Sequence, residues 1–453
     1  MTQPIDKSKV NRRQFLKQTG SLAAGAAVFS SLAPAVFSGE DNTIRLALIG
    51  CGGRGGGAVG DALSVPDSGP VKLYAMADLL ESRMSRSYDA LKKKFKDKID
   101  VSEDRKFIGF AAYRKAIDML RPGHIALCTT RAYIRPVHVE YAIRRGINVF
   151  MEKPFAPDPG GLHRLLRAGE EAQKKGVKIA AGLQCRHSPA RQALIEKIRA
   201  GEMGEIPLIR ANRFGGGGGL GNQGENANKL MSQLQFGKIH LLWVGSGHMV
   251  DNLIHQIDEC CWIKDAWPIA ADGLGGCSPR SKDCGQNIDV YSMEFTFADG
   301  TKAFCGFRRI DKTHSEFATY IHGTKCAAQF SGRTHAATVH MFKDQRIDKD
   351  NIAWTPTKDV YSPWQYEWNV FIDSIRNDRP HNEIKRAVYS DLTSLMGRAA
   401  CHTGQTVTWD QMMKSKFQFC DYLDDLNYDS PAPVKAHENG PFPVPIPGQW
   451  KEL

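Results

Sequence analysis

The sequence has little or none of several features that mark particular classes of protein. Its 453 residues include 11 cysteines, too few for a disulfide-built scaffold, and an odd number cannot all pair within the chain. Its 43 glycines follow no three-residue period, which excludes a collagen-like helix, and no internal repeat is apparent. The composition, 42% hydrophobic and 24% charged, is typical of globular proteins and excludes disorder for most of the chain.

The net charge of +11 raises the question of nucleic-acid binding, but the charge is spread unevenly. Residues 1–35 alone contribute +4. The densest lysine cluster, between Lys92 and Lys98, is interrupted by Asp97 and has no aromatic residue beyond Phe95. We interpret this cluster as a solvated helix face and expect no nucleic acid among the partners.

The N-terminus carries an apparent targeting segment. Asn11-Arg12-Arg13-Gln14-Phe15-Leu16-Lys17 precedes 22 uncharged residues rich in Ala, Gly and Ser, with a small-x-small pattern at Ala33-Pro34-Ala35. Residues 1–35 resemble a twin-arginine signal peptide, which predicts export to the periplasm or cell envelope after folding in the cytoplasm. A membrane anchor is the alternative on length, but the small residues favour cleavage, so we expect no stable membrane insertion of the mature protein. Under reducing conditions the cysteines are most simply small hydrophobic residues.

Short aliphatic runs alternate with helical spacing from Ile44 onward. Strands are predicted at 44–49, 71–77, 124–128, 147–151 and 178–182, and helices at 83–95, 113–120, 136–145 and 162–174, with Gly146 and Gly176 as C-terminal stops. This order predicts an α/β fold, with a Rossmann dinucleotide-binding domain over residues 42–183.

The pattern changes after residue 184. Alternating segments at 290–297 and 302–310, separated by the turn signal Asp299-Gly300, predict antiparallel strands, and helices follow at 364–376 and 384–403. We expect a C-terminal α+β domain over 184–420, with a large open, mainly antiparallel sheet through which the chain forms a homo-oligomer. The proline-rich tail, 421–453, is either an arm on a neighbouring subunit or an extended terminus.

A glycine-rich turn follows the first predicted strand. Gly50-Cys51-Gly52-Gly53-Arg54-Gly55 has the G-x-G-x-x-G pattern, and Asp78, at the end of the second strand, lies 23 residues beyond Gly55. Glycines allow the main chain to approach a pyrophosphate, and the helix N-terminus stabilises its charge. A carboxylate at Asp78 accepts hydrogen bonds from ribose hydroxyls and repels a 2′-phosphate, so NAD is favoured over NADP.

Two further motifs carry reactive side chains. Glu152-Lys153-Pro154 follows the fifth strand, at the edge where open α/β sheets bind ligands. Asp251, His255 and Asp258 share one stripe of a predicted helix. Taken singly these are ordinary surface or packing residues. Metal binding by His248, Asp251 and His255 fits the spacing but lacks a soft third ligand, so we predict no metal.

Together these motifs resemble the Gfo/Idh/MocA oxidoreductase family over about residues 42–415. The resemblance implies that Lys153, His255 and Asp251 surround the reacting carbinol and that the Lys153-Pro154 bond is cis. It also implies cofactor contacts from the glycine loop, Glu152, Lys153, Thr129 and Thr130, and a substrate position at Arg186. Arg131 stands where family members usually have proline.

The resemblance predicts an exported, NAD-dependent oxidoreductase that acts on a secondary hydroxyl of a sugar, glycoside or polyol. Because free NAD is scarce outside the inner membrane, the cofactor is expected to be tightly bound. The alternatives are a glycosidase or lyase that acts by transient sugar oxidation, and a noncatalytic carbohydrate-binding protein that retains NAD.

Overall fold

A six-stranded parallel sheet forms the N-terminal part of the computed structural model, which describes residues 42–216, 226–278, 285–331, 337–438 and 442–453. The strand order is β3-β2-β1-β4-β5-β6. Their bounds are β1 Ile44–Ile49, β2 Val71–Asp78, β3 Lys106–Ile108, β4 Ile125–Cys128, β5 Asn148–Met151 and β6 Ile179–Ala181. The chain order reverses between β1 and β4, which is where such sheets bind their ligands. The predicted signal peptide, residues 1–35, lies outside the described residues.

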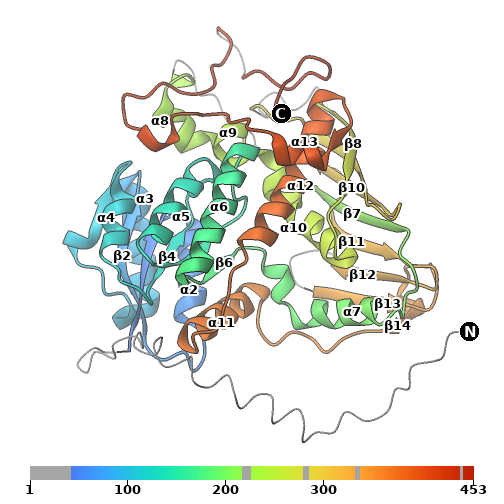
Figure 1. Cartoon of the computed structure of the whole chain (residues 1–453), viewed down its shortest axis with the longest axis horizontal. Helices are drawn as coiled ribbons and strands as arrows, with labels where there is room; N and C mark the ends of the chain where they lie inside the picture. Colours follow the sequence, from blue (N-terminus) through green and yellow to red (C-terminus); the bar gives the residue numbers. More distant parts are fainter. Residues whose placement is uncertain (1–41, 217–225, 279–284, 332–336, 439–441) are drawn as a thin grey trace, which may run out of the picture. The chain divides into compact units, whose positions relative to one another are not determined.

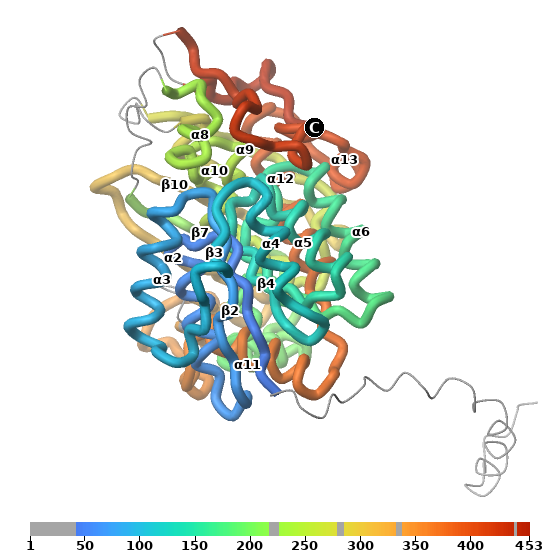
Figure 2. The backbone as a smooth tube through the Cα atoms, turned by 90° about the vertical axis from the view of Figure 1, so that its left-hand side faces the viewer, coloured from blue at the N-terminus to red at the C-terminus, as the bar shows by residue number. Residues whose placement is uncertain are grey.

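Helices cover both faces of this sheet (Figures 1 and 2). On one side lie α4 Ala112–Asp118, α5 Arg135–Arg144 and α6 Pro159–Lys175, and on the other lie α2 Gly53–Leu63, α3 Glu81–Phe95 and α11 Pro363–Arg376. Helix α11 comes from the second half of the chain. Its Trp368 stacks on Phe150 of β5, with ring centroids 4.5 Å apart. One face of the parallel sheet is therefore covered in part by a helix more than two hundred residues away in the sequence.

The second sheet has nine strands in the order β14-β13-β12-β11-β7-β10-β9-β8-β15. β10 pairs with β7 in parallel, and the other neighbouring pairs are antiparallel. The strands are β7 Leu208–Gly215, β8 Ala270–Gly276, β9 Val290–Thr296, β10 Lys302–Arg309, β11 Glu316–His322, β12 Ala327–Ser331, β13 Ala337–Phe342, β14 Ile352–Trp354 and β15 Val407–Thr408. The predicted fold, a Rossmann domain followed by a mainly antiparallel sheet, is confirmed.

One face of the second sheet is buried beneath two long helices, α10 Gly247–Lys264 and α12 Ile384–Thr403. Along β10 the buried residues Ala303, Cys305 and Phe307 alternate with more exposed ones, and Phe304 on the outer face is 42% exposed. The remaining α-helices of the described residues are α7 Pro189–Arg199, α8 Leu230–Ser232, α9 Leu242–Gly245 and α13 Trp409–Lys414. The chain from Thr43 to Leu453 forms one unit.

Several predicted elements match the structure closely. Beside the parallel sheet, the predicted stop at Gly176 adopts the left-handed conformation, with φ of +67°. In the second half of the chain, α12 has the predicted bounds. Gly300, also at positive φ, closes the predicted hairpin between β9 and β10. The sequence analysis did not identify β3, because a three-residue strand gives no periodicity.

The proline-rich tail packs on its own chain (Figure 1, red). Near its end, Glu452 is 2% exposed and accepts hydrogen bonds from Arg398 at 3.0 Å and Trp450 at 2.8 Å. Phe442 is buried as well. A few residues of the tail are thus buried in the subunit's own core, while most of its described residues are exposed or half-buried.

The ten cysteines within the described ranges form no disulfide, and all but Cys277 are buried. This agrees with their interpretation as small hydrophobic side chains. Among the helices of the described residues, none has the length and apolar content needed to cross a bilayer.

Candidate active site

The glycine turn between β1 and α2 is tight on one side and open on the other. Gly50 has φ of +95°, and a Cβ there would lie 2.6 Å from the Thr130 main-chain nitrogen. A Cβ at Gly55 would lie 2.4 Å from the Gly50 carbonyl oxygen. At Gly52 and Gly53 a Cβ would meet no atom within 4 Å. The turn therefore leaves the main chain bare where a pyrophosphate would approach the start of α2, so these residues fit a dinucleotide.

Asp78, at the carboxyl end of β2, is 6% exposed and holds this turn. Its Oδ2 accepts a hydrogen bond from the Cys51 N–H at 2.6 Å, and its Oδ1 accepts one from the Leu80 N–H at 2.9 Å. Arg83 lies 3.9 Å from Oδ1. Each carboxylate oxygen accepts more than one hydrogen bond, so Asp78 can also accept from a ribose hydroxyl.

The other predicted cofactor residues are joined by hydrogen bonds around the turn. Thr129 donates to the Gly50 carbonyl at 2.7 Å. Arg54 donates to Glu152 at 2.6 Å, and the second oxygen of Glu152 accepts from the Lys153 N–H at 3.1 Å. Thr130 lies 3.2 Å from the ring of His138. The glycine loop and the Glu-Lys-Pro motif are thus linked directly.

Lys153, Asp251 and His255 line one cavity of about 1280 Å³ together with the glycine loop and Asp78. Lys153 Nζ donates to the Asp251 main-chain carbonyl and lies 3.4 Å from the Asp251 carboxylate. His255 is 3% exposed. The Lys153-Pro154 bond is cis, as the resemblance implied. The structure therefore places the predicted reactive side chains beside the predicted dinucleotide site, while their individual roles stay predictions.

Two buried ionisable residues hold the Lys153 loop in place. Arg135 donates to the carbonyl oxygens of Pro154 and Thr130, and burial lowers the pKa of this guanidinium to about 10. Asp391 of α12 accepts from the main-chain N–H groups of Phe155 at 2.6 Å and Ala156 at 3.3 Å. Burial raises the pKa of Asp391 to about 7. Neither residue was identified from the sequence, because the contacts with Pro154, 19 positions away, and with Phe155, 236 positions away, leave no local pattern.

Arg186 does not line the large cavity. It makes a two-pronged ion pair with Asp258, with both distances 2.8 Å, and lies over the ring of Trp262. Asp258 also accepts from Ser390 at 2.5 Å. These contacts give both residues a structural role between α10 and α12. The assignment of Arg186 to substrate stays a prediction.

Two groups bear on metal binding. The Nε2 of His248, one of the ligands considered above, lies 3.0 Å from Nδ1 of His240. Elsewhere, His187, Glu367 and Glu383 place possible ligand atoms within 4.8 Å of one another. Glu383 already accepts hydrogen bonds, and burial together with Glu383 and Glu152 raises the pKa of Glu367 well above its usual value. Within the second group, His187 Nε2 lies 3.2 Å from the Glu383 carboxylate.

The cavity lining is predominantly cationic. Eight arginine and lysine side chains line it, against four carboxylates. Arg131, in the place usual for proline, lines this space with an exposed side chain. An excess of positive charge favours an anionic ligand such as a dinucleotide.

Comparison with known proteins supports this description at the level of fold. No protein-family model and no curated protein matches the sequence. Among solved structures, an aldose-aldose oxidoreductase from Caulobacter crescentus, in complex with glycerol, is 14% identical, with a TM-score of 0.62 over 81% of this chain and 99% of that one. A scyllo-inositol dehydrogenase from Lactobacillus casei, with bound NAD(H) and scyllo-inositol, is 17% identical, with a TM-score of 0.59 over 81% and 99%.

A third similar structure binds a different cofactor. It is a variant of a 3-ketoreductase from Actinomadura kijaniata in complex with TDP-benzene and NADP, 16% identical, with a TM-score of 0.59 over 80% of this chain and 98% of that one. By name these neighbours are an aldose-aldose oxidoreductase, a scyllo-inositol dehydrogenase and a 3-ketoreductase, and at this level of identity the likeness shows a shared fold. The chain shares their fold over about four fifths of its length.

Proposed function

We propose that the protein is an NAD(P)-dependent oxidoreductase that transfers a hydride between a secondary hydroxyl of a sugar, glycoside or polyol and a nicotinamide. The observation that carries this proposal is the single cavity that joins the glycine loop and Asp78 to Lys153, Asp251 and His255. The names of the three similar structures, two of which hold NAD(H) or NADP, support it.

The reaction requires a proton and a hydride to leave the same carbinol. A bound nicotinamide supplies the hydride acceptor. His255 takes the proton from the hydroxyl oxygen, because an imidazole nitrogen can accept a proton and act as a general base. Lys153 Nζ donates a hydrogen bond to that oxygen and stabilises its developing negative charge. Asp251 holds the Lys153 ammonium group beside the reacting carbon.

The bound cofactor is NAD rather than NADP, and it is held tightly. The carboxylate of Asp78 at the end of β2 supports this choice, because it would repel a 2′-phosphate. Arg83, 3.9 Å away, is the residue that would oppose it. Tight binding makes the cofactor available in a compartment with little free NAD.

That compartment is the periplasm or cell envelope, reached by the twin-arginine route. Support comes from the Arg12-Arg13 motif and the uncharged stretch behind it. Replacing both arginines by lysine should leave the protein in the cytoplasm, and cell fractionation would detect this. Periplasmic recovery of the variant would remove the signal assignment.

The protein also self-associates, through the outer face of the second sheet. Leu274, Val290 and Phe304 on or beside that face are 78%, 37% and 42% exposed. Light scattering of the purified protein tests this, and a Phe304→Glu variant should shift the mass toward the monomer.

The decisive experiment combines cofactor identification with product analysis. The natively purified protein is denatured, and the released nucleotide is identified by mass spectrometry. The intact protein is then incubated with a panel of polyols, sugars and glycosides. Ketosugars support the oxidoreductase, whereas cleaved glycosides without net redox change indicate the transient-oxidation hydrolase or lyase. Retained NAD with no product in wild type or in a His255→Gln control would indicate a binding protein.

A further inference from the structure

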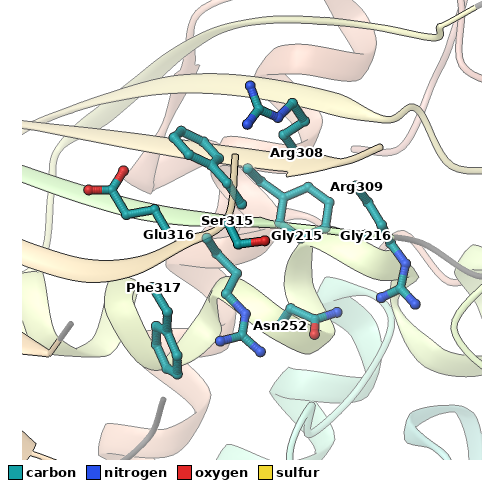
Figure 3. A pocket seen from close by; sticks show the side chains of 11 residues that line it. Gly215, Gly216, Asn252, Arg308, Arg309, Ser315, Glu316 and Phe317 are labelled. Carbon is teal, nitrogen blue, oxygen red and sulfur yellow. The ribbon is translucent and has the colours of Figure 1, made fainter. Parts of the chain in front are cut away.

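A second pocket of about 360 Å³ adjoins the candidate active site on α10 (Figure 3). Asp251 lines the large cavity, and its neighbour Asn252 lines this pocket. Between Gly247 and Gln256 these are the two positions of α10 that are not buried. Two adjacent residues of α10 therefore line the two cavities, one residue each.

Two arginines reach this pocket from the inner face of the second sheet. On β7 the inward positions run Ile209, Ala211, Arg213, and on β10 they end at Arg309. β7 and β10 pair in parallel with Arg213 opposite Phe307, so Arg213 and Arg309 share the face that covers α10. The apolar face thus becomes cationic where it meets Asn252. Figure 3 shows Arg308 pointing away from Asn252, on the opposite side of the strand from Arg309.

The surroundings of the two arginines leave their donor groups available. Arg213 lies over the ring of Phe317, with 4.0 Å from its guanidinium carbon to the centroid. Stacking uses the face of the guanidinium, so the N–H groups at its edge remain free to bind a planar anion. Among the described residues, neither Arg213 nor Arg309 makes an ion pair, and Arg309 Nε is buried without a hydrogen-bond partner.

The local charge is correspondingly positive. Burial lowers the pKa of Arg213 most, the Asp251 carboxylate raises it, and repulsion by the Arg309 guanidinium lowers it. Glu316, the carboxylate in the pocket lining, is held by Asn212 at 2.9 Å and Tyr320 at 2.7 Å. An anionic ligand group would relieve this repulsion.

We infer that this pocket binds an oxyanion of the substrate, so that the enzyme acts on a sugar carrying a carboxylate, sulfate or phosphate group. The inference rests on the proposed function, because it places that group one α10 residue away from Asp251. Arg213 and Arg309 would bind the oxyanion from the sheet, and Asn252 would contact it from the helix. The remainder of the sugar would extend into the large cavity beside Lys153 and His255.

The test compares matched neutral and anionic sugars. Turnover is measured for methyl glucoside against methyl glucuronide, and for glucose against its 6-phosphate and 6-sulfate, which distinguishes the three oxyanions. We expect at least one anionic member to exceed its neutral partner at least about tenfold in kcat/KM at low salt, with the margin falling as salt rises. Equal use of neutral and anionic sugars by wild type would overturn the inference.

Variants of Arg213 and Arg309 test whether the preference for anionic sugars arises in this pocket. Arg213→Gln and Arg309→Gln should each remove most of the preference, chiefly through KM, and Arg213→Lys should restore part of it. Arg210→Gln is the matched control, since Arg210 lies on β7 but on the exposed face. A preference that survives both glutamine variants would contradict the assigned pocket.

A binding readout separates this inference from the proposed function. The shift in thermal midpoint on adding each sugar is measured without turnover. If no sugar is oxidised but the anionic sugars stabilise wild type and not Arg213→Gln, the redox function fails and the pocket stands. If sugars are oxidised without any anion-dependent stabilisation, the redox function stands and the pocket assignment fails.

Discussion

The two walls of the large cavity are built by different means. The cofactor wall is the glycine turn, residues 50–55, together with Asp78. The hydrogen bond from the Cys51 N–H to the Asp78 carboxylate joins residues 27 positions apart. The substrate wall is made of the Lys153, Asp251 and His255 side chains, of which Lys153 and Asp251 are 98 positions apart. Behind this wall, the Phe155 main-chain N–H donates to Asp391, 236 positions away. The first wall depends on what the backbone permits, and the second depends on buried polar contacts between segments.

The variants with the largest expected effect test whether side chains of the substrate wall act on the reacting oxygen. His255→Ala or Lys153→Ala should lower kcat by about 10²- to 10⁴-fold while changing the dissociation constant of NAD less than about tenfold, because both groups act on the reacting oxygen. Steady-state kinetics and cofactor titration measure the two quantities. Lys385→Ala, an exposed lysine on α12, is the control. Equal losses in turnover and NAD binding would contradict the division between the walls.

Paired glycine substitutions test the cofactor wall. Gly55→Ala places a Cβ 2.4 Å from the Gly50 carbonyl, so it should lower the free energy of unfolding by about 1–3 kcal/mol and weaken NAD binding. Gly53→Ala meets open space and should weaken NAD binding without loss of stability. Denaturant titration and cofactor titration of both variants separate these outcomes. Equal destabilisation by the two alanines would mean that the turn is not constrained by close approach.

Asp391, which lies behind the substrate wall, should make the free energy of unfolding depend on pH. Burial raises the pKa of Asp391 from its usual 3.8 to about 7, so its contribution to stability is present at low pH and is lost as pH rises between about 4 and 7. Asp391→Asn keeps an acceptor for the Phe155 N–H and removes this titration. Between about pH 5 and pH 8, wild type should lose about 2–3 kcal/mol of unfolding free energy relative to the variant. Parallel pH profiles for both proteins would show that Asp391 does not titrate in this range.

The same division explains what the sequence could and could not predict. Local periodicity and spacing predicted β1, α12, the glycine turn and Asp78, because neighbours in the chain determine each of them. The packing of Trp368 on Phe150 could not be predicted, since no local pattern encodes contact between distant segments. Arg213 did leave a signal: a charged residue at an inward position of an otherwise buried strand face.

The smallest effect concerns cofactor choice within the cofactor wall. Asp78→Asn removes the charge that would repel a 2′-phosphate but keeps an oxygen that can accept one of the two main-chain hydrogen bonds of Asp78. The ratio of NADP to NAD dissociation constants should fall about tenfold, or about 1.4 kcal/mol. Loosening of the turn would weaken both cofactors alike, so the ratio isolates the charge. Arg83→Gln, which removes the cation 3.9 Å from Asp78, should move the ratio in the opposite direction, and a ratio unchanged in both variants would remove this pair from cofactor selection.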